Sequence, residues 1–381
     1  MKIVFAPDSF KESLTAAEAA AAMQRGFAKV FPQAEYICMP MADGGEGTAD
    51  ALVNALNGEW ISAEVHDPLG RPIFARYGLL PGNRAVIEIA EAAGLHLVAA
   101  DERNPLHTST FGVGQLILHA LSRGCRHIIL GLGGSATNDA GAGMLQALGF
   151  KLLDQNGQPL PVGGATLAGL SAVNDEAVPA ALRECHFEAA CDVTNPLCGA
   201  QGASAIFGPQ KGATPQMVVA LDTALSHYAD IIAAHGFADS RDQAGSGAAG
   251  GMGFTLRSVL NAQLLPGIEM VMAETDLNAC LKGADLVVTG EGRMDGQTAF
   301  GKVPSGVLKA AQAQGIAVIG IAGSVGGDAA ALNALGFKAV FPTIAAPASL
   351  TDILASAAHN VERTAEQVAA VWQLGMNRQT R

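Results

Sequence analysis

The chain has 381 residues, more than a single hydrophobic core usually spans, so we expect two domains. It is 49% hydrophobic and only 15% charged, with 46 glycines, which is typical of a large α/β core with many tight turns and excludes a disordered chain. The 23 basic and 35 acidic residues give a formal net charge of −12, and no basic run occurs. This balance disfavours nucleic acids and anionic membranes as partners.

The cysteines and the apolar segments indicate a cytoplasmic protein. Six cysteines are scattered without CxxC or zinc-like spacing, which is typical of reduced thiols that are mostly buried. The first apolar run is too short for a signal peptide before Asp8 and Lys11 interrupt it. The longest uncharged stretches, 193–210 and 310–327, are broken by Gly, Pro, Asn or Gln, so we expect no membrane span and a soluble chain.

Two βα units open the chain. Their strands and helices are predicted at 2–6, 15–30, 35–39 and from about 48 to 57. Thr15 and Glu18 have the spacing of a capping box, which sets the start of the first helix. Both strands end in loops with charged residues, namely Asp8, Lys11, Asp43 and Glu46.

From residue 59 the pattern changes, which we interpret as the start of a second domain. Three successive strands joined by turn signals are predicted at 59–66, 71–80 and 84–89, and consecutive hairpins indicate an antiparallel or mixed sheet. Further helices and strands follow at 111–122, 127–130, 187–191 and 215–235. Two glycine-rich stretches lie among them, at 131–143 and 245–253, and the second is a candidate flexible hinge or cradle.

The βα alternation returns after about residue 282. Strands are predicted at 285–290, 316–322 and 339–343, and helices at 302–314, 328–335 and 350–373. Joined to the first two units, they make a five-stranded parallel sheet for which we expect the flavodoxin-like order 2-1-3-4-5. The predicted fold is therefore α/β with two domains. A discontinuous flavodoxin-like domain, residues 1–58 and 282–381, carries an inserted α/β domain with a mixed sheet, residues 59–281.

The loop after the third parallel strand carries four charged residues, Glu291, Arg293, Asp295 and Lys302. A charged loop is often only solvated, but ligands of open α/β sheets lie beyond the carboxyl ends of the strands, which favours a functional role. Residues 296–302 match GxxxxGK. The following Ser or Thr is missing and the match begins six residues past the strand, so a P-loop is disfavoured. Lys302 could still neutralise a phosphate.

These residue types suit phosphoryl transfer, which needs carboxylates for Mg²⁺, cations for phosphates and an acid that accepts the hydroxyl proton. Asp192, directly after a predicted strand, is the expected base, and the alternative is a cap on the turn at 194–195. Lys11 and Asp8 are further catalytic candidates. Glu291 and Asp295 are the metal-ligand candidates.

Other residues are candidates for the substrates. Arg293 could pair with a substrate carboxylate, as could Lys11, and the remaining substrate candidates are Asp43, Gly44, Gly45 and Glu46. The loop that contains Gly133, Gly134 and Ser135 runs into a predicted helix, where backbone N–H groups and the helix dipole favour a phosphate; tight packing is the alternative. Lys211 and Lys302 are further phosphate candidates, and plain surface exposure is the alternative for Lys211.

Several other chemistries are disfavoured. None of the nine histidines has HxxxH or HExxH spacing, which argues against a zinc hydrolase. There is no G-x-S-x-G elbow and no GxGxxG after the first strand.

Six motifs together carry a family resemblance: APDSFKESL from Ala6, ADGGEGT from Ala42, GLGGSATNDAGAGM from Gly131, CDVTNPL from Cys191, FGPQKG from Phe207 and TGEGRMD from Thr289. In this order they resemble the bacterial type I glycerate kinase family over essentially the whole chain. The resemblance implies ATP- and Mg²⁺-dependent phosphorylation of D-glycerate, usually at the 2-hydroxyl, in glyoxylate or sugar-acid breakdown. It also implies a flavodoxin-like domain interrupted by a second α/β domain. The third motif resembles the phosphate loop of the galactokinase and mevalonate kinase superfamily too, but that fold has no place for five βα units.

The resulting expectation is a glycerate 2-kinase that transfers the phosphoryl group in line in an interdomain cleft, with ATP as co-substrate and Mg²⁺ as cofactor. The expected partners are D-glycerate and ATP, with no nucleic acid and no membrane, and a homodimer is left open. Two alternatives remain. One is a kinase of another small sugar acid such as erythronate, which pocket size would decide. The other is a non-catalytic cytosolic metabolite-binding regulator, which would not need a cluster of carboxylates that can bind a metal ion.

Overall fold

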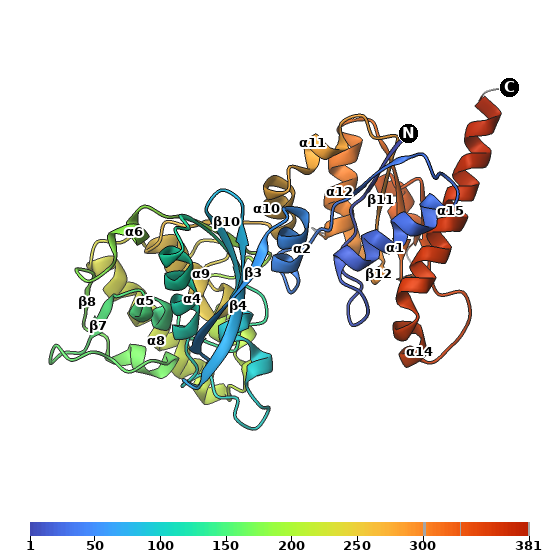
Figure 1. Ribbon diagram of the computed structural model, residues 1–381. Coiled ribbons are helices and arrows are strands. Elements are labelled where there is room, and N and C mark those ends of the chain that lie inside the picture. Colours follow the sequence, from blue (N-terminus) through green and yellow to red (C-terminus); the bar gives the residue numbers. More distant parts are fainter. Residues whose placement is uncertain (300–301, 328, 380–381) are drawn as a thin grey trace. The chain divides into compact units, whose positions relative to one another are not determined.

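The computed structural model describes residues 1–299, 302–327 and 329–379, and the chain divides into two compact units (Figure 1). The first unit comprises Met1–Asp43, Asp50–Leu56 and Ile268–Arg381. The second comprises Gly44–Ala49 and Asn57–Gly267. The domain boundaries expected from the sequence, after residues 58 and 281, stay a prediction.

The first unit contains a five-stranded parallel sheet of order β15-β13-β11-β1-β2. Its strands are β1 (Lys2–Phe5), β2 (Glu35–Cys38), β11 (Leu286–Thr289), β13 (Ala317–Ala322) and β15 (Ala339–Pro342). Every neighbouring pair is parallel. Counted along the chain and from the β2 edge, the order is 2-1-3-4-5, so the flavodoxin-like arrangement is confirmed.

The helices of the first unit follow the predicted βα alternation. They are α1 (Ala16–Ala28), α2 (Thr48–Ala55), α10 (Gly267–Glu274), α11 (Leu277–Leu281), η4 (Gly296–Ala299), α12 (Val303–Gln312), α13 (Ala329–Leu335), α14 (Leu350–Ala355) and α15 (Ala357–Gln379), with the short strands β12 (Arg293–Met294) and β14 (Ser324–Val325). The Thr15–Glu18 capping box is confirmed, because each side chain accepts from the other residue's backbone N–H. The single helix predicted at 350–373 is wrong, since the chain leaves the helix at Ser356.

Both faces of this sheet are covered, as the uninterrupted apolar strands predicted. Phe5 and Val288 belong to one buried cluster with apolar residues of α1 and α15. Val4 and Val287 alternate with them and are also fully buried, and α12 packs against β11 and β13 (Figure 1). Helices α1 and α15 approach closely at Gly26, where a Cβ would lie 2.3 Å from the backbone oxygen of Glu362.

The second unit contains a six-stranded sheet of order β10-β9-β6-β5-β4-β3. Its strands are β3 (Glu59–His66), β4 (Pro72–Leu80), β5 (Arg84–Glu88), β6 (His127–Gly131), β9 (His186–Ala190) and β10 (Gln263–Leu265). β3, β4 and β5 pair antiparallel, whereas β5, β6, β9 and β10 pair parallel, so the predicted mixed sheet is confirmed. Two short strands, β7 (Lys151–Leu153) and β8 (Ala172–Asn174), pair separately.

The helices of the second unit are α3 (Ala90–Ala93), η1 (Leu95–Leu97), α4 (Phe111–Ser122), α5 (Ala142–Ala147), η2 (Gly164–Gly169), α6 (Ala180–Arg183), α7 (Ala203–Phe207), η3 (Pro209–Lys211), α8 (Pro215–Ala234) and α9 (Ala248–Ser258). Of the helices in the described ranges, α8 alone has the length and apolar composition of a membrane span. Its Leu221, Leu225 and Tyr228 are fully buried, and Leu225 and Tyr228 belong to the unit's core, which is typical of a core helix.

The glycine-rich stretch 245–253 is almost entirely buried and closely packed, which argues against the predicted flexible hinge or cradle. A Cβ at Gly250 would lie 2.0 Å from the backbone oxygen of Thr137. The glycines therefore serve a close approach between two backbones. All six cysteines are free, as predicted, although only Cys125 is fully buried.

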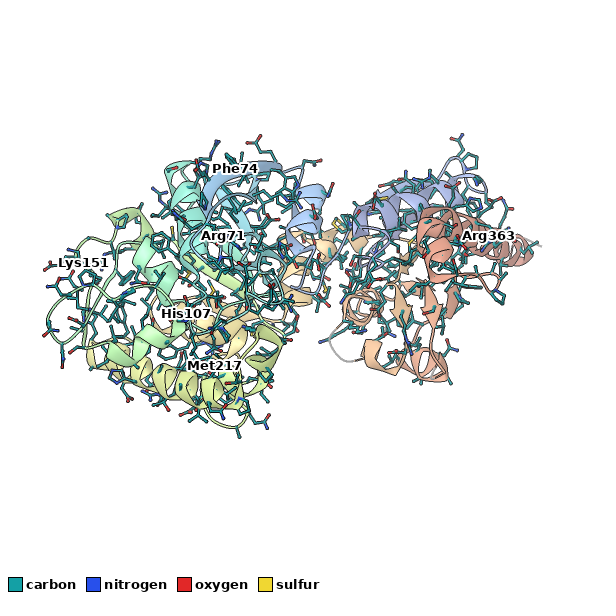
Figure 2. All side chains as sticks on the ribbon, turned by 90° about the horizontal axis from the view of Figure 1, so that it is seen from below. Arg71, Phe74, His107, Lys151, Met217 and Arg363 are labelled. Atoms are coloured by element: carbon teal, nitrogen blue, oxygen red, sulfur yellow. The ribbon has the colours of Figure 1, made fainter. Side chains whose placement is uncertain are left out.

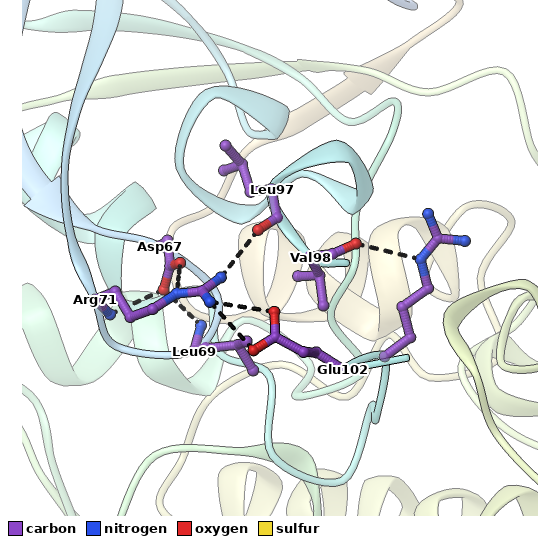
Figure 3. A network of polar contacts seen from close by, with 7 residues as sticks. Asp67, Leu69, Arg71, Leu97, Val98 and Glu102 are labelled. Carbon is purple, nitrogen blue, oxygen red and sulfur yellow. Dashed lines mark hydrogen bonds and ion pairs between the residues drawn. The ribbon is translucent and has the colours of Figure 1, made fainter. Parts of the chain in front are cut away.

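The β3–β4 hairpin is fixed by a buried carboxylate, which Figure 3 shows. Asp67 is 3% exposed, and its Oδ1 accepts from the backbone N–H groups of Leu69 at 2.8 Å and Arg71 at 2.9 Å. The Nε of Arg71 donates to Oδ2 at 2.6 Å. The guanidinium also reaches Glu102 at 3.2 Å and the backbone oxygen of Leu97 at 3.1 Å. Asp67 thus satisfies the turn, and Arg71 connects it to the segment after η1.

We predict that Asp67→Asn lowers the free energy of unfolding of the second unit by about 1–3 kcal/mol, because charged hydrogen bonds inside the turn are weakened. The chain has two tryptophans, and Trp60 lies in this unit, so denaturation in a Trp372→Phe background reports on it alone. Glu102→Gln is the control, since the Arg71–Glu102 pair is 47% and 45% exposed and is worth at most about 1 kcal/mol. Equal effects of the two substitutions would contradict the role of the Asp67 carboxylate in holding the turn.

Candidate active site

Backbone pairing brings three loops of the first unit together beyond the carboxyl ends of β1, β2 and β11. Ala6 N donates to the oxygen of Val288 at 2.9 Å, and Asp8 N donates to that of Gly290 at 2.8 Å, so the β1–β11 ladder continues past both strands. Met41 N donates to the oxygen of Pro7 at 3.0 Å, which holds the loop after β2 against the same segment. The charged residues that follow are therefore neighbours.

Asp8 is the most perturbed acid of this set. It is 9% exposed, and burial raises its pKa from 3.8 to about 7. The negative charges of Asp43 and Glu291 contribute to this rise, while a 2.7 Å hydrogen bond from Ser9 N and the charge of Lys11 oppose it. A buried carboxyl among like charges is costly for the fold and is typical of functional sites.

Glu291 lies beside Asp8 and has its own partners. Its Oε1 accepts from the hydroxyl of Thr298 at 2.8 Å, and its Oε2 lies 3.5 Å from the Nζ of Lys302. Burial raises the pKa of Glu291, and Thr298 and Lys302 lower it. Lys302 directly precedes α12, as predicted. The GxxxxGK match can be followed only in part, because residues 300 and 301 lie outside the described residues.

Arg293 and Asp295 form an ion pair at the outer edge of this loop. The Nε of Arg293 lies 3.0 Å from Oδ2 of Asp295, and their side chains are 69% and 20% exposed. Asp295 N also donates to the hydroxyl of Thr298 at 3.0 Å, which links the pair to Glu291. Within the described part of the chain, no three of these carboxylates bring their ligand atoms within 4.8 Å of one another.

In the second unit, Asp192 follows β9 and lies beside Gly44. Its Oδ1 accepts from the backbone N–H of Gly267 at 3.0 Å. A Cβ at Gly44 would lie 2.6 Å from the Cβ of Ala190 and 3.5 Å from Oδ2 of Asp192, and Gly44 has a φ of +89°. Only glycine fits this position. The side chain of Asp192 is exposed, so a substrate hydroxyl could reach it.

The loop that begins at Gly44 rests on the glycine-rich loop after β6. A Cβ at Gly133 would lie 3.3 Å from the Cα of Gly45 and 3.7 Å from the backbone nitrogen of Glu46. Glu88, at the end of β5, accepts from the backbone N–H groups of Gly47 at 3.1 Å and Ala49 at 2.9 Å. The parallel strands β5, β6 and β9 thus end in one group of loops.

Lys211 holds the glycine-rich loop from inside the unit. It is 2% exposed, so the alternative of a plain surface lysine is wrong. Its Nζ donates to the hydroxyl of Ser135 at 2.8 Å and to the backbone oxygen of Thr137 at 2.7 Å. Burial lowers the pKa of Lys211 to about 7, and the charge of Asp139 opposes the shift. Gly134, next to Ser135, has exposed backbone with a φ of +71°.

The helix dipole contributes less to this loop than the sequence suggested. Helix α5 begins only at Ala142, eight residues after Gly134. The N–H groups of Gly141 and Gly143 donate to the fully buried Asp139 at 3.1 and 3.2 Å, so they are already bonded. The carboxylate also accepts from the backbone and the hydroxyl of Thr110, both at 2.9 Å. Burial raises the pKa of Asp139, and these four donors oppose the rise.

The structure therefore gathers the sequence-predicted residues in two sets, one in each unit. The set in the first unit consists of Asp8, Lys11, Asp43, Glu291, Arg293, Asp295 and Lys302, and that in the second of Gly44, Gly45, Glu46, Gly133, Gly134, Ser135, Asp192 and Lys211. Sequence reasoning missed Glu88, Asp139 and Thr298, which hold the loops of these sets. Asp139 lies within the motif GLGGSATNDAGAGM, so the sequence offered a reason to consider it.

Comparison with known proteins identifies the family of the chain. Residues 3–373 match the model of the glycerate kinase family. The chain belongs to this family. It is 50% identical over 371 residues to a glycerate kinase of Bacillus subtilis strain 168, covering 97% of both chains. It is 47% identical over 377 residues to glycerate 2-kinase of Escherichia coli K12, covering 99% of both.

A crystal structure from Salmonella typhimurium LT2, described as a candidate glycerate kinase 2, has the same fold. It superposes with a TM-score of 0.92 at 51% identity and covers 99% of both chains. The resemblance drawn from the six motifs is thus confirmed, as is the prediction of a phosphotransferase. Membership of the glycerate kinase family also removes the alternative of a non-catalytic regulator.

We predict that Asp8→Asn stabilises the first unit of this kinase at high pH. The folded chain holds the Asp8 proton more tightly than the unfolded chain, so stability falls as the pH rises from 3.8 to about 7. Asparagine can still accept from Ser9 N and carries no charge. The variant should therefore exceed the wild type by about 1–3 kcal/mol at pH 8 and match it near pH 4.

Denaturation followed by Trp372 in a Trp60→Phe background measures this difference, because Trp372 lies in the first unit. Glu35→Gln, at the exposed start of β2, is the control and should show no such pH dependence. A gain from Asp8→Asn of equal size at both pH values would disprove the stated cause.

Proposed function

We propose that the chain transfers the γ-phosphoryl group of ATP to the 2-hydroxyl of D-glycerate, giving 2-phosphoglycerate, with Mg²⁺ as the required cation. The observation that carries the proposal is the near-complete match to glycerate 2-kinase of Escherichia coli, at 47% identity over 377 residues. The buried acids of the first unit and the glycine loops of the second provide the charge types that phosphoryl transfer needs.

Asp192 is the proposed general base. Its Oδ1 is oriented by Gly267 N at 3.0 Å, and its side chain is exposed at the end of β9. A carboxylate fixed in this way can accept the proton of the substrate hydroxyl as the oxygen attacks phosphorus. Gly44 lies beside it, and Gly44, Gly45 and Glu46 are proposed to contact glycerate. Arg293 is proposed to pair with the substrate carboxylate.

Mg²⁺ fits the donor set of the first unit. Mg²⁺ prefers carboxylate oxygens and usually binds through one or two of them together with substrate phosphates, so a tight cluster of three is not required. Glu291 and Asp295 are the proposed ligands. Burial is the main cause of the raised pKa values of Asp8 and Glu291, and neighbouring carboxylates add to it, so a bound cation would favour the charged forms of both groups. When bound, Mg²⁺ would neutralise charge on the transferring phosphoryl group.

The exposed backbone of Gly133 and Gly134 is the proposed contact for the nucleotide phosphates. Ser135 and Lys211 bond to each other, so we assign them the task of holding this loop in shape. Lys11 and Lys302 are the proposed cations beside the acids, and Asp8 and Asp43 complete that set. We further propose a cytoplasmic enzyme whose small-molecule partners are ATP and D-glycerate, with a homodimer as the open possibility for assembly.

The purified protein should release ADP from ATP only when Mg²⁺ and D-glycerate are both present, and ³¹P NMR should identify 2-phosphoglycerate as the product. Erythronate in place of glycerate tests the acceptor, and a faster reaction with erythronate would overturn the choice of substrate. A product phosphorylated at the 3-hydroxyl would overturn the position only.

We predict that Asp192→Asn lowers kcat by at least roughly 100-fold with little change in KM, as for loss of a general base. Asp222→Asn is the matched control, because Asp222 also lies in the second unit and accepts from a backbone N–H, that of Gly199 at 2.9 Å. The control should retain activity. If Asp192→Asn kept a nearly unchanged kcat, Asp192 would not be the base.

We predict that Lys211→Met raises the KM for ATP by roughly tenfold or more, because two buried hydrogen bonds worth about 1 kcal/mol each no longer hold the loop. The KM for glycerate should change less. Lys151→Met is the control, since Lys151 projects into solvent at the edge of the same unit (Figure 2). A folded Lys211→Met enzyme with an unaltered KM for ATP would refute this role.

A further inference from the structure

Two histidines and a glutamate converge on one face of the second unit's sheet, away from the loops described above. His127 opens β6 and His186 opens β9, and the two are direct partners in the parallel register. Glu188 lies two residues after His186 on the same strand, so the alternation of side chains puts it on the same face. The register of two neighbouring strands therefore fixes all three side chains on one face.

The distances within this trio suit a metal ion. Nε2 of His127 lies 3.3 Å from Oε2 of Glu188, and Nε2 of His186 lies 3.1 Å from Oε1. Each residue offers a ligand atom, and these atoms all lie within 4.8 Å of one another. In a tetrahedral zinc site with bonds of about 2.0–2.1 Å, neighbouring ligand atoms are about 3.3 Å apart. The two histidine–glutamate distances are thus close to this spacing, and the ligand atoms of the two histidines lie within 4.8 Å of each other.

The buried nitrogen of His127 is a separate observation. Among the described residues, His127 Nε2 is one of few buried side-chain atoms that make no hydrogen bond of acceptable geometry. An unsatisfied buried polar atom is costly, and metal coordination is one way to satisfy an imidazole nitrogen. On β5, the register partner of His127 is Arg84, whose Nε donates to the backbone oxygen of Pro81 at 2.8 Å, which anchors its guanidinium at the hairpin turn.

We propose that His127, His186 and Glu188 bind one divalent transition-metal ion of the Zn²⁺ class, with water completing the coordination. Imidazole nitrogens favour such ions over Mg²⁺, which prefers oxygen ligands. The bound ion would tie β6 to β9 at their amino ends.

This site is separate from the proposed chemistry. The glycine-rich loop and Asp192 follow the carboxyl ends of the same two strands, and a five-residue strand spans about 13 Å. The ion is therefore expected to stabilise the second unit and not to take part in phosphoryl transfer. Metal binding can be measured without kinase activity. The binding result would therefore remain interpretable even if the proposed function were wrong.

The experiment is a Zn²⁺ titration of the chelator-treated full chain by calorimetry, in millimolar Mg²⁺ to occupy the carboxylates of the first unit. We expect one equivalent with a Kd on the order of 1 μM. His186→Asn and Glu188→Gln should each weaken it by at least about tenfold, and saturating Zn²⁺ should raise the Tm of the wild type by roughly 5 °C but not that of His186→Asn.

His235→Asn is the matched control. His235 is also a partly exposed histidine of this unit beside a carboxylate, with Nε2 3.7 Å from Asp175, but it lacks a second histidine. It should keep full affinity, and His186→Asn should keep the kinase activity of the wild type. The absence of a saturable equivalent, or undiminished binding in His186→Asn and Glu188→Gln, would overturn the proposal.

Co²⁺ gives a second readout, since thiolate ligands produce a strong charge-transfer absorption that nitrogen and oxygen ligands lack. The bound Co²⁺ should show only weak visible bands. A thiolate band would assign the binding to the free cysteines and would also overturn the site.

Discussion

The parallel register of β1 against β11 decides where charge gathers in the first unit. Because the backbone pairing continues from Ala6–Val288 to Asp8–Gly290, the two loops leave the sheet side by side. Gly290 also lies close to β13, since a Cβ there would lie 1.7 Å from the backbone oxygen of Ile321. A slip of one residue would turn every side chain of β1 to the opposite face, which is also buried, and would break the packing of Phe5 in its cluster. The repulsion between Asp8 and Glu291 is thus imposed by the same register that buries Phe5 and Val288.

The two units treat buried charge in opposite ways. Asp139 has four donors and Lys211 has two acceptors, so each charge is satisfied by local hydrogen bonds and serves the scaffold. Asp8 accepts from Ser9 N, but burial and two like charges raise its pKa to about 7. Satisfied networks stabilise a loop, whereas the charge of a buried carboxylate beside like charges is relieved by a proton or by a bound cation. This contrast is why we place the metal with the acids of the first unit.

Local pattern was enough to predict most of the fold. Apolar runs, turn signals and the Thr15–Glu18 cap predicted the strands, the hairpins and the first helix, because each is encoded within a few residues, whereas the 2-1-3-4-5 order was expected from the flavodoxin-like arrangement. The burial of Lys211 was not predictable, since it depends on a bond to Ser135, 76 residues away. Helix α5 starts late because the N–H groups of Gly141 and Gly143 donate to the carboxylate of Asp139. The run of small residues in this loop does not predict these hydrogen bonds.

Strand polarity explains why candidate residues could be found without knowing the fold. Parallel strands present all their carboxyl ends at one edge, so Glu88, Gly131 and Asp192, each at or just after the end of a strand, come to the same edge of the second sheet. The same rule sends His127 and His186, which begin their strands, to the opposite edge. Within one sheet, the candidates for phosphoryl transfer therefore lie at the carboxyl ends of the strands, and the proposed metal ligands lie at or near the amino ends. The HxxxH pattern does not detect these histidines, because they are 59 residues apart in the sequence and are brought together by the register between β6 and β9.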